Sequence, residues 1–262
     1  MTIGARTSRL LFDSGSPGLR ILAAAVPDGA ARRTGRPAKG QFSSGLVVEG
    51  EAATGSVSIG GAEASNLTFQ IVDHTGCASL IAAYCSHLLA VNDMFTTYSG
   101  VLGVAAAGAT ESCCANPLLE LGGGIGRRFI IHSALADPTL TLNPDDAALS
   151  GFTMLNVPLG TRPLGCIRLG TAEPTRCGEL IFDTGSLLTT VYANDIEKGP
   201  RQAEATAVTV GDWSHDLAAK SGTVIALLVP STRNRIVVGL PVMQSVDVFY
   251  DLEGGRMGLL SR

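Results

Sequence analysis

Short runs of apolar and β-branched residues, separated by Gly, Ser and Asn, recur along the chain and are typical of strands. Within 55–59 polar and apolar positions alternate, as in a strand with one buried face, and two glycines then favour a tight turn. A second hairpin is predicted where Glu253-Gly254-Gly255 separates two apolar runs. The predicted strands are 10–12, 19–24, 45–48, 55–59, 67–72, 129–131, 139–142, 246–250 and 257–260.

Helical patterns are sparse by comparison. The best candidates are 77–91 and a short segment at 240–244. The basic, turn-rich stretch 28–40 is predicted to be a solvated loop, and 135–164, rich in Pro, Asp and Leu, is expected to connect two halves. Many short strands with few helices indicate an all-β protein whose sheets are mostly antiparallel.

The composition indicates a folded protein. The chain has 262 residues, of which 45% are hydrophobic and 16% charged, so it can bury a sizeable core. The net charge of −4 gives no basis for a nucleic-acid partner. No apolar run approaches the length of a membrane span, and residues 1–11 lack the apolar core of a signal peptide.

Six cysteines bear on the compartment of the protein. Close spacing groups four of them into two pairs that could form disulfides in a secreted, periplasmic or vacuolar-type compartment, namely Cys77 with Cys85 and Cys166 with Cys177. The other two, Cys113 and Cys114, are adjacent. Buried, reduced thiols are the alternative. A metal site that joins His87 to the two cysteines nearest to it is a third reading, although the spacing fits no zinc pattern.

One short motif occurs twice. Phe12-Asp13-Ser14-Gly15-Ser16 returns as Phe182-Asp183-Thr184-Gly185-Ser186, and each copy follows a short apolar run. A single Asp beside Gly is most simply read as an Asx-turn residue. Two copies instead indicate two similar half-structures, each of which presents one carboxylate. Some reactions require such a pair, because the two carboxyl groups share one proton and one water.

With these motifs the chain resembles the pepsin-type aspartic proteases. Thr2-Ile3-Gly4 is similar to the strand that enters the first loop in that family. Gly100-Val101-Leu102-Gly103 and Ile236-Val237-Val238-Gly239 are similar to the apolar-apolar-Gly segments that follow the two motifs. Val248-Phe249-Tyr250-Asp251 and Arg256-Met257-Gly258-Leu259 resemble the closing segment of the family.

The resemblance implies an all-β, bilobal pepsin-like acid-protease fold, with two pseudo-symmetric, β-barrel-like lobes around a central cleft. The expected lobes are 1–140 and 141–262, each with one Asp motif. Asp13 and Asp183 are the implied catalytic residues, and they would activate one water to attack a peptide bond without a metal or a cofactor. The implied partner is a peptide or protein substrate, and the protein is expected to be a monomer. An acidic optimum follows, because one carboxyl must stay protonated.

The residues after each Asp would support the two loops. The glycines would allow a sharp turn, and the hydroxyl residues before them would hydrogen-bond across the lobe interface. The final serine of each motif would donate to the outer oxygen of its own carboxylate. These supporting residues are Ser14, Gly15, Ser16, Thr184, Gly185 and Ser186.

Several features depart from the family pattern. The mobile hairpin over the cleft is expected at 41–61, and its nearest aromatic residue is Phe42, where the family has a Tyr. Phe cannot donate the hydrogen bond that a Tyr would donate. Phe42 is therefore either a flap residue without that bond or a plain hydrophobic residue. Arg20 stands where the family often has the Trp that partners that Tyr. The second half is also short, since 56 residues separate its Asp from its Gly partner, against 90 in the first half.

The leading hypothesis is an aspartic endopeptidase that cleaves extended peptides between apolar residues. A non-catalytic relative that binds or inhibits another protein is the alternative. The lost flap pair and the short second half favour the alternative, and the two intact Asp motifs oppose it. A tandem fusion of two retroviral-type halves is a third reading, which the distinct halves disfavour.

Overall fold

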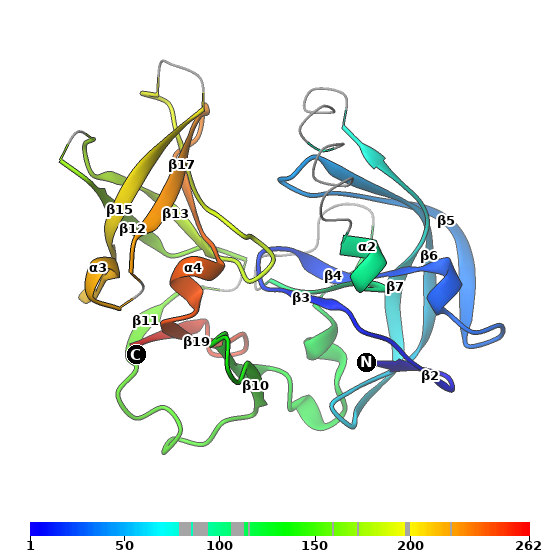
Figure 1. Cartoon of the computed structure of the whole chain (residues 1–262). Helices are drawn as coiled ribbons and strands as arrows, with labels where there is room; N and C mark the ends of the chain where they lie inside the picture. The colour runs from blue at the N-terminus through cyan, green and yellow to red at the C-terminus, as the bar shows by residue number, and fades with distance from the viewer. Residues whose placement is uncertain are drawn as a thin grey trace. The chain divides into compact units, whose positions relative to one another are not determined.

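The computed structural model describes residues 1–78, 85, 94–105, 113–114, 116–158, 160–171, 173–196, 200–220 and 222–262. Strands dominate these residues and helices are short, so the prediction of an all-β protein is confirmed (Figure 1). Contacts divide the chain into two compact units, Met1–Gly126 and Arg127–Arg262. Among the described residues, every helix is too short or too polar to span a bilayer.

The described part of the first unit forms an eight-stranded sheet. Its strands are β1 (Thr2–Ile3), β2 (Arg6–Thr7), β3 (Leu11–Asp13), β4 (Pro17–Leu22), β5 (Ala31–Gln41), β6 (Leu46–Ile59), β7 (Ala62–Cys77) and β8 (Gly100–Val104). The hydrogen-bonded order is β2-β1-β6-β7-β4-β8-β3, and β5 pairs with β6. The short helical turns are η1 (Ala23–Ala25), α2 (Met94–Thr97), η3 (Pro117–Glu120) and η4 (Gly122–Gly124).

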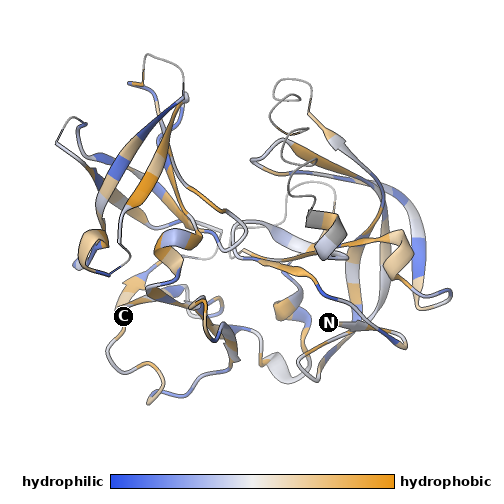
Figure 2. Cartoon of the chain, in the orientation of Figure 1, coloured by the Kyte–Doolittle hydropathy of each residue, from blue (hydrophilic) through white to orange (hydrophobic). Residues whose placement is uncertain are grey.

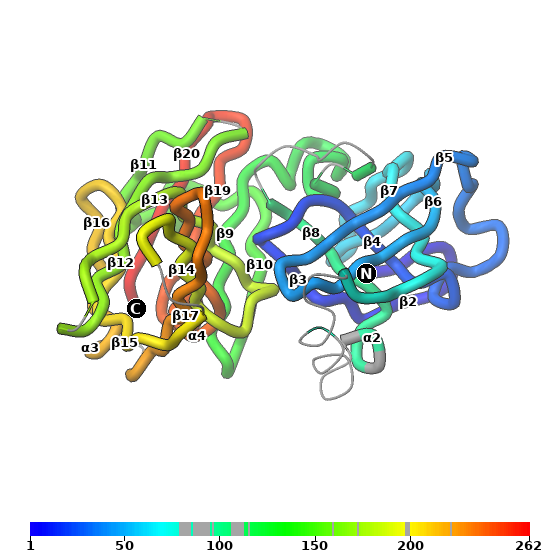
Figure 3. Tube along the Cα trace, turned by 90° about the horizontal axis from the view of Figure 1, so that it is seen from above, coloured from blue at the N-terminus to red at the C-terminus, as the bar shows by residue number. Residues whose placement is uncertain are grey.

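The second unit contains two sheets. In the five-stranded sheet β11 (Thr153–Asn156), β20 (Arg256–Ser261), β19 (Val246–Asp251), β9 (Arg128–His132) and β10 (Thr139–Leu142) follow one another (Figure 3). The seven-stranded sheet contains β12 (Leu164–Leu169), β13 (Arg176–Phe182), β18 (Arg235–Val238), β14 (Thr189–Ala193), β17 (Val224–Pro230), β15 (Arg201–Val210) and β16 (Trp213–Asp216). Because β12 also pairs with β15, six of these strands close into a barrel. The short helices are α3 (Leu217–Lys220) and α4 (Leu240–Met243).

The same four-stranded arrangement occurs once in each unit. In the first unit β3 runs parallel to β8, β8 antiparallel to β4, and β4 parallel to β7. In the second unit β13 runs parallel to β18, β18 antiparallel to β14, and β14 parallel to β17. The repeated sequence motif therefore reports a repeated piece of structure, and each Asp motif follows the corresponding strand, β3 or β13.

Each unit buries its own core. Hydrophobic positions, drawn in orange, alternate with hydrophilic positions along many strands (Figure 2). In the first unit Leu19, Ile21 and Phe69 are fully buried, and in the second unit Phe182 and Phe249 are. The alternation that predicted strands thus reflects one buried face per strand.

The prediction of a solvated loop at 28–40 is wrong. Ala31–Gln41 form β5, which pairs along β6 with an irregularity between Arg33 and Pro37. Most side chains of β5 are exposed, so the sequence lacks the apolar alternation that would have indicated a strand.

The other predicted elements are mostly found. The predicted strand runs coincide with β3, β4, β6, β7, β9, β10, β19 and β20. Both predicted hairpins are present, because β6 pairs with β7 and β19 with β20. The helical segment 240–244 matches α4, whereas 77–91 lies outside the described residues apart from Cys77, Ala78 and Cys85.

The division between the compact units lies at Gly126, fourteen residues before the expected lobe boundary. Strands β9 and β10 pair with each other, and β9 also pairs with β19 near the C-terminus. Residues 127–140 therefore belong to the second unit. The stretch 135–164, expected to connect the halves, contains β10 and β11 of that unit.

Candidate active site

Asp13 is the last residue of β3 and is almost fully buried, with 5% of its surface exposed. Its Oδ1 accepts hydrogen bonds from the backbone amides of Gly15 (2.8 Å) and Ser16 (3.2 Å). Its Oδ2 accepts a hydrogen bond from the Ser16 hydroxyl. Three donors on two oxygens hold the carboxyl group of Asp13 in one orientation.

A glycine on β8 allows this loop to lie close against the strand behind it. Asp13 on β3 and Gly18 on β4 are paired with Gly103 from its two sides. A Cβ at position 103 would collide with the carbonyl oxygens of Ser16 and Gly18. The backbone amide of Ala105 also donates to the Ser16 carbonyl (3.1 Å). The apolar-apolar-Gly segment on β8 therefore packs against the backbone of the Asp13 loop and holds it in place.

Asp183 follows β13 and has a similar setting in the second unit. Its Oδ1 accepts a hydrogen bond from the Gly185 amide (2.8 Å), and its own amide donates to the Val238 carbonyl (2.9 Å). A Cβ at Gly239 would collide with the carbonyl oxygen of Ser186. The second apolar-apolar-Gly segment thus supports the second loop as the first one does.

The two loops differ at their last serine. The Ser16 hydroxyl donates to Asp13, whereas the Ser186 hydroxyl donates to the carbonyl oxygen of Leu188 (2.7 Å). A hydroxyl group has a single proton, so Ser186 cannot donate to its own carboxylate in this geometry. The donation expected of Ser16 is present, and the one expected of Ser186 is directed elsewhere.

Ser14 and Thr184 are buried, with 4% and 7% of their surfaces exposed. The hydrogen bonds across the lobe interface that we expect of them stay a prediction. Asp13 and Asp183 belong to different compact units, and their joint action on one water also stays a prediction.

Tyr250 on β19 is a residue that sequence reasoning did not assign to the site. Burial raises the pKa of its hydroxyl, and the negative charge of Asp183 raises it further. The ring packs against Phe129, with 5.2 Å between the centroids. The phenol therefore stays protonated near Asp183, as a neutral group that can donate a hydrogen bond. The only signal in the sequence was its place in the closing segment of the resemblance.

Phe42 lies in the turn between β5 and β6. The backbone amide of Phe42 donates to the Leu46 carbonyl (2.9 Å), and the Gly45 amide donates to the Phe42 carbonyl (2.9 Å). Its ring is partly buried and packs against a cluster that includes Leu46, Val48 and Val72. Phe42 is thus a packing residue at the tip of the β5–β6 hairpin. The hairpin expected at 41–61 is wrong, because Leu46–Ile59 form the single strand β6. A role of Phe42 as a flap residue stays a prediction.

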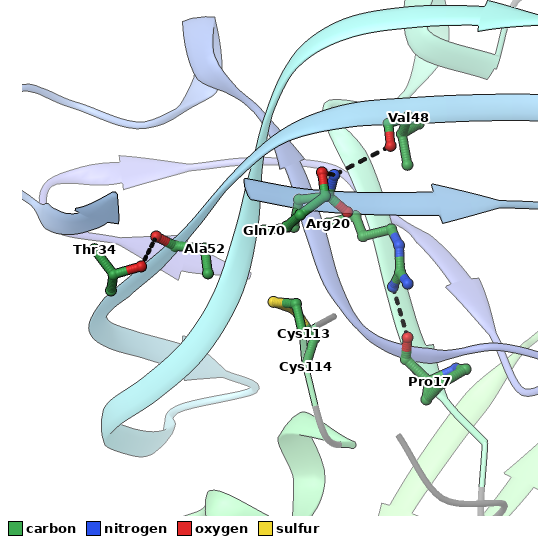
Figure 4. Close-up of a disulfide and its surroundings, with 9 residues drawn as sticks. Pro17, Arg20, Thr34, Val48, Ala52, Gln70, Cys113 and Cys114 are labelled. Atoms are coloured by element: carbon green, nitrogen blue, oxygen red, sulfur yellow. Dashed lines mark hydrogen bonds between the residues drawn. A yellow bond between two sulfur atoms is a disulfide. The ribbon is translucent and has the colours of Figure 1, made fainter. Parts of the chain in front are cut away.

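Arg20 is buried, with 6% of its surface exposed, although charged residues are rarely buried. Its Nη1 donates to the carbonyl oxygen of Pro17 (2.7 Å), directly after the first motif (Figure 4). The neighbouring Gln70 donates to the carbonyl oxygens of Ala38 and Val48, at 2.9 and 3.2 Å. The sequence marked Arg20 as a replacement, but it did not show that the guanidinium group is enclosed.

Three disulfides are present among the described residues. Both predicted pairs are confirmed, and an additional bond joins Cys113 to Cys114. The alternative of reduced thiols is therefore wrong. The metal reading is contradicted as well, because Cys77 and Cys85 are bonded to each other; its third member, His87, lies outside the described residues. No group of three or more potential metal ligands occurs among the residues that the structure describes.

The bond between adjacent cysteines lies close to the first Asp loop. Cys113 and Cys114 are buried together with Ala38 and Ala52 (Figure 4). A Cβ at Gly18, on β4, would collide with the Cβ of Cys114. Adjacency was the only signal in the sequence, and Cys114 needs a positive φ of 80°, which non-glycine residues rarely adopt.

Comparison with known proteins supports the fold. The chain is similar to the aspartic proteinase from Irpex lacteus, whose crystal structure matches with a TM-score of 0.65 and 15% sequence identity. The match covers 98% of this chain and 91% of the other. The chain therefore has a pepsin-like fold. A family described as "Protein of unknown function (DUF3443)" matches residues 5–120, and no curated protein sequence matches.

Proposed function

We propose that the protein is an aspartic-type endopeptidase in which Asp13 and Asp183 activate one water to hydrolyse a peptide bond. The observation that carries this proposal is the repeated loop. In each unit an Asp carboxyl accepts a hydrogen bond from the amide of the following Gly, and an apolar-apolar-Gly strand supports the loop. A pepsin-like fold adds support, because the similar structure is that of an aspartic proteinase.

The chemistry divides between the two carboxyl groups. One carboxylate removes a proton from the water as the water oxygen attacks the peptide carbonyl carbon. The other, protonated carboxyl gives its proton to the carbonyl oxygen, where negative charge develops. No metal and no covalent intermediate take part. The substrate is an extended peptide, and the exposed side chains of Leu187 and Leu188 beside the second loop favour apolar residues near the scissile bond.

The test is cleavage of an unfolded protein substrate between pH 3 and 7, with and without a statine-type inhibitor. We expect Asp13→Asn and Asp183→Asn each to lower kcat/KM by about 10²–10⁴-fold, as for loss of a general acid or base. Asp28→Asn and Asp137→Asn, at exposed positions in the two units, are matched controls that should leave activity unchanged. Full activity in either loop variant would refute the paired carboxyl groups.

One observation favours a non-catalytic binding or inhibitory protein. The Ser186 hydroxyl donates to a backbone carbonyl in place of its own Asp, which leaves the two loops unequal. A folded protein that neither cleaves any substrate nor binds the statine-type inhibitor would support this second function.

We also propose that the protein works in a secreted, periplasmic or vacuolar-type compartment. Three disulfides are consistent with an oxidising environment. Loss of activity after reduction under native conditions would agree with this assignment, and a protein isolated from its cells with reduced thiols would contradict it.

A further inference from the structure

We propose that Arg20 is a positioning residue for Asp13, because its buried guanidinium group holds the first Asp loop through the carbonyl oxygen of Pro17. The inference rests on the proposed function, because it assigns a role within the same site. It depends on three observations: the contacts of the guanidinium group, its enclosure and the neutral residue at the equivalent place in the second unit.

The contacts of Arg20 lead directly to the loop. Arg20 lies on β4, two residues after Gly18, and Gly18 is paired with the same β8 glycine as Asp13. Its Nη1 donates to the carbonyl oxygen of Pro17 (2.7 Å). Pro17 directly follows Ser16, whose amide and hydroxyl donate to Asp13. A shift of the guanidinium group would therefore move the residue that orients the carboxylate.

The guanidinium group is also enclosed from the side of the long hairpin. A Cβ at Gly40, on β5, would collide with Nε of Arg20 and lie 3.2 Å from its Cζ. Nε has no hydrogen-bond partner among the described residues, so its polarity is not offset there by a bond. The absence of a side chain at Gly40 thus makes room for Arg20 beneath the hairpin.

A buried cation is costly unless a negative charge compensates for it. Burial lowers the pKa of the Arg20 guanidinium, and the charge of Asp13 raises it again. Among the described residues, Asp13 is the ionisable group whose charge acts on Arg20; the neighbours Gln70, Gly40 and Val101 are neutral.

The second unit lacks this charge. Thr190 on β14 is paired with Val237 as Arg20 on β4 is paired with Val101. Thr190 is buried and neutral. The two Asp loops therefore share a fold but differ in the charge next to them.

The test measures hydrogen exchange at the amides of Gly15 and Ser16, which donate to Asp13, in the intact chain. We expect Arg20→Met to speed exchange at both amides by roughly 10- to 100-fold, as for loss of a hydrogen bond from a charged group. Arg20→Lys keeps the charge and should restore most of the wild-type behaviour. Arg33→Met, which removes a more exposed arginine from β5, is the matched control and should have no effect.

Unchanged exchange at both amides in folded Arg20→Met protein would overturn the proposal. If that variant does not fold, Arg20→Gln replaces it, because a neutral amide can still donate to Pro17. If both neutral variants fail to fold while Arg20→Lys folds, the charge itself holds the loop, which supports the proposal. Failure of Arg20→Lys as well would contradict a role based on charge.

This readout does not require cleavage, so failure of the proposed function would appear separately, as wild-type protein without protease activity. In an active enzyme, Arg20→Met should lower kcat more than it raises KM, and Arg20→Lys should restore most of kcat. A loss of stability with unchanged kcat would indicate a merely structural role and count against the inference.

Discussion

Ser16 contacts the Asp13 carboxyl group through both its amide and its hydroxyl. Ser16→Ala removes the hydroxyl donor and keeps the amide. A hydrogen bond to a charged group contributes about 1.5–3 kcal/mol, so we expect kcat/KM to fall by roughly 10- to 100-fold. Steady-state kinetics on one peptide substrate measures this change. Ser186→Ala should cost less, because its hydroxyl donates to the Leu188 carbonyl, and equal losses in the two variants would contradict this account.

His215 on β16 is a buried residue outside the proposed reaction, with 1% of its surface exposed. Its Nδ1 lies 2.9 Å from the Ser261 hydroxyl and its Nε2 lies 2.8 Å from the Ser245 hydroxyl. Its ring is stacked on Trp213, with 5.6 Å between the centroids. Burial lowers the pKa of His215, the charge of Lys220 lowers it further, and Asp216 opposes both.

The lowered pKa of His215 predicts a loss of stability in acid. Above about pH 6.5 the ring is neutral in both the folded and the unfolded chain. Below that pH the unfolded chain binds a proton that the folded chain resists, so the free energy of unfolding falls until the pH reaches the folded pKa. We expect His215→Gln to show a smaller fall between pH 7 and 5 in urea unfolding. Exposed His74→Gln is the control, and an unchanged pH dependence in His215→Gln would exclude this contribution.

At the scale of residues, the sequence predicted where the site residues lie in the chain better than which groups they contact. The two Asp motifs could be found because a rare pattern is repeated with its flanks. The direction of the Ser186 hydroxyl could not be predicted, since it depends on where the Leu188 carbonyl lies after folding. The enclosure of Arg20 was also hidden, because it depends on Gly40, which is distant in sequence.

At the scale of elements, the β12–β13 hairpin offers a direct test of a disulfide. Cys166 and Cys177 are paired across the hairpin and closed by a disulfide over 11 residues. Both are at least partly exposed, so replacing them by Ala creates little cavity. The loop-entropy estimate predicts that Cys166→Ala with Cys177→Ala lowers the free energy of unfolding by about 3 kcal/mol. Urea unfolding measures this change in the free energy of unfolding, and reduced wild-type protein should match the double variant. An unchanged free energy of unfolding would show that this disulfide does not constrain the unfolded chain.

Parts of β6 and β7 were predicted and β5 was not, because β5 is mostly exposed. Strands β6 and β7 carry apolar positions that pack in the core, and parts of both were predicted. Strand β5 is held by its pairing with β6, and its Arg and Gly residues give no alternation to detect. The turn at Gly60-Gly61 was predictable, because both glycines adopt a positive φ that other residues avoid.

At the scale of the whole molecule, the main structural feature is the four-stranded arrangement that occurs once in each unit. The sequence showed this repeat only at the two Asp loops and at the two apolar-apolar-Gly segments that end in Gly103 and Gly239. The residue types are restricted there, because the Asp loops carry the proposed chemistry and their backbone lies against each glycine. The strands between them have diverged, as the buried Arg20 and Thr190 at equivalent places illustrate. The position of the boundary between the units could not be read, since it depends on pairing between β9 and the distant β19.

The proposed function makes a last prediction about both units together. A statine-type peptide that binds both Asp loops should slow hydrogen exchange at the amides of Gly15 and Gly185 in the same sample. Ligand at about 100 times its Kd should also raise the free energy of unfolding by about 2.7 kcal/mol. Asp13→Asn and Asp183→Asn should each weaken protection at both loops, because one ligand contacts both carboxyl groups. Protection of a single loop, with the other unaffected, would show that the two carboxyl groups do not act on one substrate.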